Sequence, residues 1–200
     1  MSFSSLVRRG GLAAMLGGAL FVVSALLIAS MPRGCIGGEC TLEPMRDTGV
    51  AGALLMLALL LVVMGAAGLV VRVRRAGRLG RLGKTGIVVA AVGAALPVIG
   101  GLVQGVLFDG DYPLMPFFVI PGVLALVVGF VLLGLAVLQA RVLPRWAAVL
   151  LVIGSLAMLG FNDQNAQALM AIPNGIAWMT VGYLLWSGKG ETGQQPTRVR

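Results

Sequence analysis

Few side chains in this sequence have the chemistry that catalysis needs. Histidine is absent, and with it the residue that most often serves as a general base and as a metal ligand. The remaining acid/base groups that could serve a reaction are Asp109, Asp111 and Asp163. We therefore expect a protein that is not an enzyme and that has neither a metal site nor a cofactor. A membrane enzyme built on the three aspartates is the least favoured alternative.

Neutral hydrogen-bonding residues form a second candidate set. Gln104, Asn162 and Asn174 lie within or beside long apolar segments, where a polar side chain usually faces a bundle interior or a wet cavity. Together with the three aspartates they define a candidate ligand-binding path. The alternative is that these Asn and Asp residues only satisfy helix ends and form loops.

The two cysteines lie close together, at Cys35 and Cys40, with Gly37 and Gly38 between them. Glycines allow the tight turn that a short disulfide loop requires, and an oxidising compartment would favour the bond. We predict a structural disulfide. A redox-active pair and two free thiols are the alternatives.

A dense basic segment runs from Arg72 to Lys84. Its charged residues are Arg72, Arg74, Arg75, Arg78, Arg81 and Lys84. Each such residue near an anionic leaflet contributes about 1 kcal/mol of attraction, so we predict contact with anionic lipids. If the segment were one helix, Arg74, Arg78 and Arg81 would share a face. A pure topology signal and a docking site for a protein are the alternatives, and no nucleic-acid motif accompanies the segment.

Composition indicates which elements must hold these residues. The chain is 58% hydrophobic and 11% charged, with a mean hydropathy of +1.00, whereas roughly a quarter of the residues of soluble domains are charged. A membrane-spanning helix needs about 20 apolar residues. Six segments qualify or nearly so: 11–30, 49–71, 85–108, 116–138, 146–161 and 166–186. We predict an all-α, polytopic membrane bundle of six transmembrane helices in one domain, residues 1–186, and a disordered cytoplasmic tail, residues 187–200.

The basic residues also predict the orientation. Cytoplasmic loops carry an excess of Lys and Arg. With six spans, every basic residue except Arg33 and Arg46 falls on one side, together with Glu191 alone of the seven acidic residues. We therefore predict a multi-pass protein of the plasma membrane with both termini in the cytoplasm.

Small residues recur at seven-residue spacing, close to two helical turns, so each set lies on one helix face. Examples are Gly86/Gly93/Gly100, Gly122/Gly129 and Gly175/Gly182, and Gly101 and Gly105 form a GxxxG pair. In lipid, small residues let helix backbones approach closely. The favoured interpretation is packing inside one bundle, and the alternative is dimerisation. Similar positions in alternate segments indicate either three related two-helix hairpins or chance similarity in a chain rich in Gly and Ala.

The stretch from Ala140 to Ala148, ARVLPRWAA, leads into an apolar segment. It resembles a loop-to-helix junction of uncharacterised bacterial multi-pass membrane proteins, and the resemblance implies a bacterial inner-membrane protein and no activity. We expect an accessory or regulatory membrane protein whose partners are the bilayer, anionic lipids at the cytoplasmic face and either a second copy or another membrane protein. The alternative is a small transporter or channel for a neutral or weakly polar solute.

Overall fold

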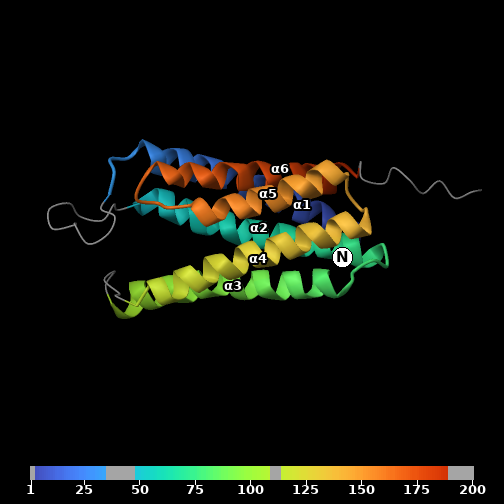
Figure 1. The fold of residues 1–200 in the computed structure, drawn as a ribbon, viewed down its shortest axis with the longest axis horizontal. Coiled ribbons are helices and arrows are strands. Elements are labelled where there is room, and N and C mark those ends of the chain that lie inside the picture. Colours follow the sequence, from blue (N-terminus) through green and yellow to red (C-terminus); the bar gives the residue numbers. More distant parts are fainter. Residues whose placement is uncertain (1–2, 35–47, 109–113, 189–200) are drawn as a thin grey trace, which may run out of the picture.

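The computed structural model describes residues 3–34, 48–108 and 114–188 of the 200-residue chain. Its α-helices run along the long axis of the molecule (Figure 1). Their bounds are α1 Phe3–Ser30, α2 Gly49–Arg75, α3 Arg81–Leu107, α4 Pro116–Ala140, α5 Arg145–Ala157 and α6 Ala171–Ser187, and two short 3-10 helices, η1 Met158–Gly160 and η2 Ala166–Met170, lie between α5 and α6. The described residues contain no strand, which confirms the all-α prediction.

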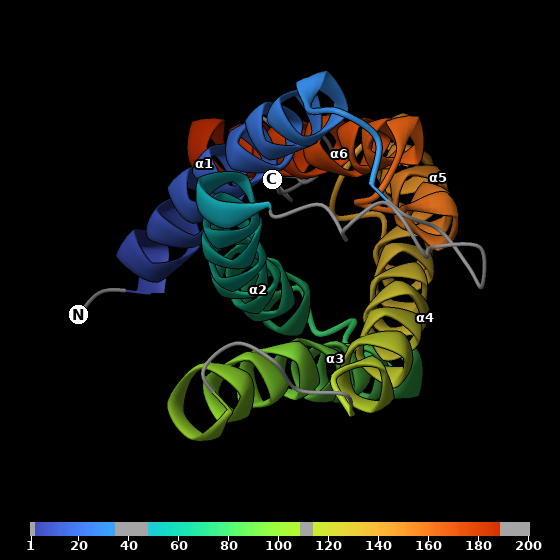
Figure 2. The same ribbon diagram turned by 90° about the vertical axis from the view of Figure 1, so that its left-hand side faces the viewer.

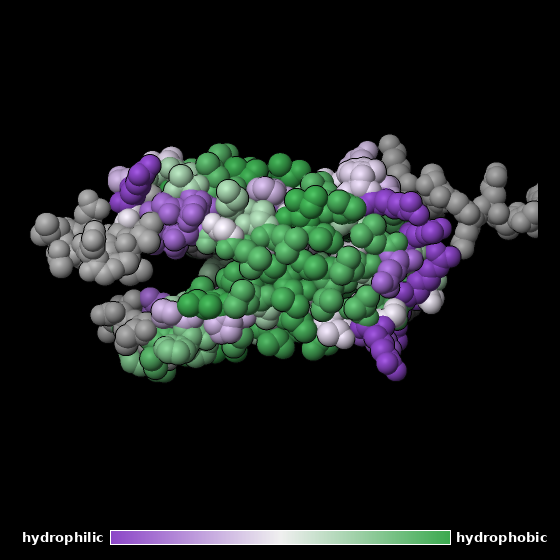
Figure 3. Space-filling model, viewed as in Figure 1, coloured by the Kyte–Doolittle hydropathy of each residue, from purple (hydrophilic) through white to green (hydrophobic). Residues whose placement is uncertain are grey.

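Five helical segments are long and apolar enough to cross a membrane. Four of them are α1 to α4, and the fifth is Ala166–Ser187, which combines η2 with α6. The remaining segment, Arg145–Gly160, is apolar but shorter. Figure 3 shows apolar side chains over the middle of the molecule and hydrophilic ones gathered toward its ends. The chain therefore has the architecture of a membrane-embedded helical bundle.

Several helices extend beyond the predicted spans where the basic residues lie. α1 begins at Phe3 rather than residue 11, α2 ends at Arg75 rather than residue 71, and α3 begins at Arg81 rather than residue 85. The predicted ranges followed the apolar runs, but Arg and Lys are good helix formers and the backbone hydrogen bonds continue through them. We call the end of the bundle where these basic residues lie the basic end; it contains the turns at residues 76–80 and 141–144. The other end is called the opposite end.

Some predicted features lie outside the described residues. These are the disulfide between Cys35 and Cys40, the carboxylates Asp109 and Asp111, and the tail from residue 189 onward. They remain predictions.

Glycines bring pairs of helices into close contact. A Cβ atom added at Gly86 of α3 would lie 2.9 Å from the carbonyl oxygen of Gly129 in α4, and Gly93 meets Gly122 seven residues further along. The corresponding pairs between α1 and α6 are Gly11 with Gly182 and Gly18 with Gly175. The seven-residue pattern therefore marks packed faces inside the bundle, as predicted.

The GxxxG pair is an exception. A Cβ atom added at Gly101 or Gly105 would meet nothing within 4 Å among the described residues. The face of α3 that carries Gly93 and Gly100 packs on α4. Gly101 lies about 100° around the helix from Gly100 and is therefore on a different face. The prediction that the GxxxG pair packs inside the bundle is therefore wrong for the single chain.

Seen from the opposite end, the helices form a ring in chain order from α1 to α6 (Figure 2). α1 packs mainly against α2 and α6, and α3 mainly against α4, whereas α2 and α3 share a smaller contact. Trp178 of α6 is fully buried and meets Phe130 of α4 edge to face, with ring centroids 4.9 Å apart. This contact joins the α3–α4 hairpin to the remaining helices.

Candidate functional site

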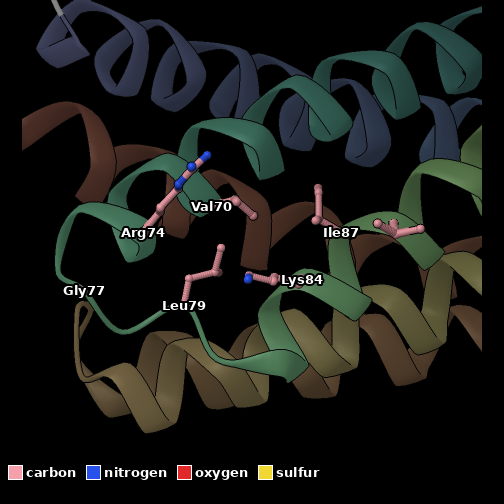
Figure 4. A pocket seen from close by; sticks show the side chains of 7 residues that line it. Val70, Arg74, Gly77, Leu79, Lys84 and Ile87 are labelled. Atoms are coloured by element: carbon pink, nitrogen blue, oxygen red, sulfur yellow. The ribbon is translucent and has the colours of Figure 1, made fainter.

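A pocket lies between α2 and α3 at the basic end. We call it the basic pocket; its volume is about 530 Å³, and its lining residues are Val70, Arg74, Gly77, Leu79, Lys84, Ile87 and Val88. Arg74 comes from α2 and Lys84 from α3, and Figure 4 shows the Lys84 side chain directed toward the space between the two helices. The other side chains of the lining are aliphatic. The pocket thus combines two cations with an apolar wall.

Helical spacing explains why these residues share one pocket. Val70 precedes Arg74 by four residues, and Ile87 and Val88 follow Lys84 by three and four. Residues three or four apart lie on the same helix face. Each cation at a helix end is therefore followed, one turn deeper in the bundle, by aliphatic side chains.

The basic segment is not one continuous helix. α2 ends at Arg75, α3 begins at Arg81, and between them Gly77 has a φ of +67°. Glycine adopts this left-handed conformation without steric cost, and the chain reverses there. The face that Arg74, Arg78 and Arg81 would share in a single helix does not form.

Two of the predicted lipid-contact residues bind the ends of other helices. Arg78 Nη1 donates a hydrogen bond to the carbonyl oxygen of Ala140, the last residue of α4, at 2.8 Å. Arg72 Nη1 donates to the carbonyl oxygen of Leu184 in the last turn of α6 at 3.3 Å. The last carbonyls of a helix lack partners within it, and a cation there also interacts favourably with the helix dipole. These two arginines therefore have a structural role.

The basic end has no acidic residue within the described part of the chain. Asp163 is the single acid in residues 3–34, 48–108 and 114–188, and it follows η1 at the opposite end. Arg74, Arg81 and Lys84 are exposed. Because no described carboxylate offsets these charges, the basic end attracts anions.

The residues of the predicted ligand-binding path lie on separate elements. Gln104 belongs to α3 and Asn174 to α6, whereas Asn162 and Asp163 follow η1. Asn162 Oδ1 accepts a hydrogen bond from the Gln164 backbone N–H at 2.8 Å, and Asp163 Oδ1 accepts one from Gln164 Nε2 at 3.1 Å. Asn and Asp commonly stabilise turns through such bonds, so these two side chains help to shape the turn before η2.

Asn174 is the member of this set that lies deepest in the bundle. Its side chain is 1% exposed, and its Oδ1 atom has no hydrogen-bond partner among the described residues. The Nε1 atom of Trp178, one turn further along α6, also lacks a partner there. Buried polar groups of this kind commonly bind ordered water. Trp178 itself is 0% exposed, so its ring packs inside the bundle.

The sequence identified the two cations of the basic pocket but not its apolar wall. The sequence signal that could have predicted the wall is an aliphatic residue three or four positions from each cation. Val70 has this spacing from Arg74, and Ile87 has it from Lys84. Leu79 had no such signal because its position depends on the turn at Gly77.

Comparison of the chain with protein-family models, with curated proteins and with solved structures found no match.

Proposed function

We propose that this chain is a non-enzymatic accessory protein of the cytoplasmic membrane that binds an anionic phospholipid in the basic pocket. The observation that carries the proposal is the placement of Arg74 and Lys84 over the aliphatic wall of Val70, Ile87 and Val88. An anionic phospholipid offers the matching chemistry, since its phosphate attracts the two cations and its acyl chains bury apolar surface. A free inorganic anion has no apolar part that could contact the aliphatic wall.

The orientation of the bundle supports the choice of ligand. By the positive-inside rule the basic end faces the cytoplasm, and the cytoplasmic leaflet is the one that carries anionic lipids. In this arrangement both termini are cytoplasmic and α5 with η1 makes a sixth crossing. Arg145–Gly160 would be about 24 Å long as a helix, somewhat less than the hydrocarbon core of about 30 Å. Local thinning of the bilayer accommodates a short helix at modest cost.

We expect a cysteine placed in the turn between α2 and α3 to react with a membrane-impermeant thiol reagent only from the cytoplasmic side. The test uses Ala76→Cys, at an exposed position of that turn, in a chain whose own cysteines are replaced by C35S and C40S. A membrane-impermeant maleimide should label it only after the cells are permeabilised. The matched control is Leu114→Cys at the opposite end, which is 50% exposed and should react in intact cells. The reverse pattern would contradict the proposed orientation.

We expect removal of both pocket cations to weaken binding of phosphatidylglycerol by about thirty-fold. The variant is R74A/K84A, and the estimate takes about 1 kcal/mol for each charge and 1.4 kcal/mol for each ten-fold change in affinity. Binding is measured by native mass spectrometry of the detergent-purified protein, titrated with phosphatidylglycerol and, separately, with phosphatidylcholine. The wild type should prefer the anionic lipid.

The matched control is Arg81→Ala in the same helix as Lys84. Arg81 is exposed but does not line the pocket, so its loss should change affinity by only a few-fold. R74K/K84R keeps both charges and should bind nearly as the wild type does. If Arg81→Ala weakens binding as much as R74A/K84A, the lipid recognises diffuse charge and the basic pocket is not its site.

A further inference from the structure

A cleft separates the α3–α4 hairpin from the other helices at the opposite end. Figure 3 shows the surface hollowed there, and the same view in Figure 1 places α4 below the opening and α2 and α5 above it. We call it the hairpin cleft. Both connections of the hairpin to neighbouring helices, residues 76–80 and 141–144, lie at the basic end. The hairpin is thus tied to the bundle at one end and stands apart at the other.

The burial pattern of α4 shows where the hairpin leaves the bundle. Toward the basic end α4 packs on α5, where a Cβ atom added at Gly134 would lie 2.7 Å from the side chain of Val152. Between residues 116 and 125 the single buried residue of this helix is Gly122. Its nearest neighbours, Pro97 and Gly93, belong to α3. The part of the hairpin beside the cleft therefore packs on itself.

The separated part of the hairpin is strongly apolar. Its exposed side chains include Leu102 at 62%, Val106 at 74%, Phe117 at 74% and Ile120 at 60%. α3 and α4 are both long and apolar enough to cross a membrane, so most of this surface lies at the depth of the hydrocarbon. Water in contact with such a surface is unfavourable, whereas hydrocarbon is not.

An aromatic contact joins α4 to α6 a short distance beyond the separated part of the hairpin. Phe130 lies five residues past residue 125 of α4 and meets Trp178 of α6, and both rings are almost fully buried. Asn174 and Trp178, whose polar atoms Oδ1 and Nε1 have no hydrogen-bond partner among the described residues, are 1% and 0% exposed. These polar atoms are therefore not exposed to water in the cleft.

We propose that the hairpin cleft holds acyl chains of phospholipids from the leaflet at the opposite end. The chains lie between the α3–α4 hairpin and the helices α2 and α5, with their ends toward Phe130. This site is separate from the basic pocket: the two lie at opposite ends of the bundle, and the cleft recognises hydrocarbon rather than charge. Its occupancy does not depend on Arg74 or Lys84, so either proposal can fail without the other.

Because Trp178 contacts Phe130, it provides a reporter for the inner end of the proposed acyl-chain site. The chain has three tryptophans, and the variant W146F/W186F leaves Trp178 alone. We expect its fluorescence to fall by roughly half in vesicles of phosphatidylcholine brominated at mid-chain, relative to unbrominated vesicles, because bromine in the cleft comes within contact distance of the Phe130–Trp178 pair. Acrylamide in the aqueous phase should have no such effect. The control W146F/W178F leaves Trp186, which is 39% exposed and should be quenched by lipid in any case.

Two results would overturn the proposal. Quenching of Trp178 by acrylamide would mean that water fills the cleft. Quenching by neither reagent, with Trp186 still quenched by lipid, would mean that protein closes the cleft, either through movement of the hairpin or through a helix of another chain. Thermal unfolding of both double variants establishes that they are folded, and W146F/W186F/K84A should behave as W146F/W186F does.

Discussion

Replacing Gly93 by leucine should prevent stable assembly of the α3–α4 hairpin. A Cβ atom at this position would collide with the backbone nitrogen of Leu126 and would lie 2.8 Å from the carbonyl oxygen of Gly122. Overpacking usually costs about 1–3 kcal/mol, but here the obstacle is backbone that no change of side-chain rotamer can relieve. We expect a loss of at least about 3 kcal/mol in the free energy of unfolding, measured by titration with SDS in mixed micelles.

The same helix supplies the matched control for Gly93→Leu. Gly101 is exposed, and a Cβ atom there meets nothing within 4 Å among the described residues. Replacing a helical glycine gains up to about 1 kcal/mol of helix propensity, so Gly101→Leu should be neutral or slightly stabilising. Equal stability of the two variants would show that α3 and α4 do not pack through Gly93. Marked destabilisation by Gly101→Leu would instead show that another chain packs on the GxxxG face.

These two glycines also show how far the sequence predicts the fold. The seven-residue spacing of Gly86 and Gly93 identifies a packed face, because in lipid close backbone approach requires small residues. Spacing does not say which helix lies opposite, and it cannot distinguish Gly101, which belongs to a similar motif but lies on another face of α3. Apolar length predicted the helices well. It placed their ends poorly at the basic end, because α2 and α3 continue into residues that no span contains.

The basic pocket was predictable in its charge and not in its shape. Arg74 and Lys84 stand out in the sequence, but so do Arg72 and Arg78, whose guanidinium groups bind the carbonyl ends of α6 and α4. Which cations bind helix ends and which line the pocket depends on the reversal of the chain at Gly77. That reversal is a property of tertiary structure. The hairpin cleft is still less accessible to sequence reasoning, because its walls have the same apolar composition as packed helices.

Trp178→Ala should be among the most destabilising single substitutions in this protein. Trp178 is the largest of the fully buried side chains, and it joins α6 to the α3–α4 hairpin through Phe130, at 4.9 Å between ring centroids. Replacement of a buried tryptophan by alanine costs about 3–5 kcal/mol, since the surroundings collapse only partly into the cavity. Trp178→Phe should cost less, because it keeps an aromatic ring at the contact and removes an N–H group that has no described partner.

The matched control is Trp146→Ala, since Trp146 is 59% exposed at the start of α5, and it should change stability by less than about 1 kcal/mol. A double-mutant cycle of Trp178→Ala with Phe130→Ala isolates the contact between the rings, for which we expect a coupling energy of about 0.5–1.5 kcal/mol. Additive effects of the two substitutions would mean that the rings do not interact. In that case the hairpin would be held to the bundle by the packing of α4 on α5, by the smaller contact of α3 with α2 and by the turns at the basic end.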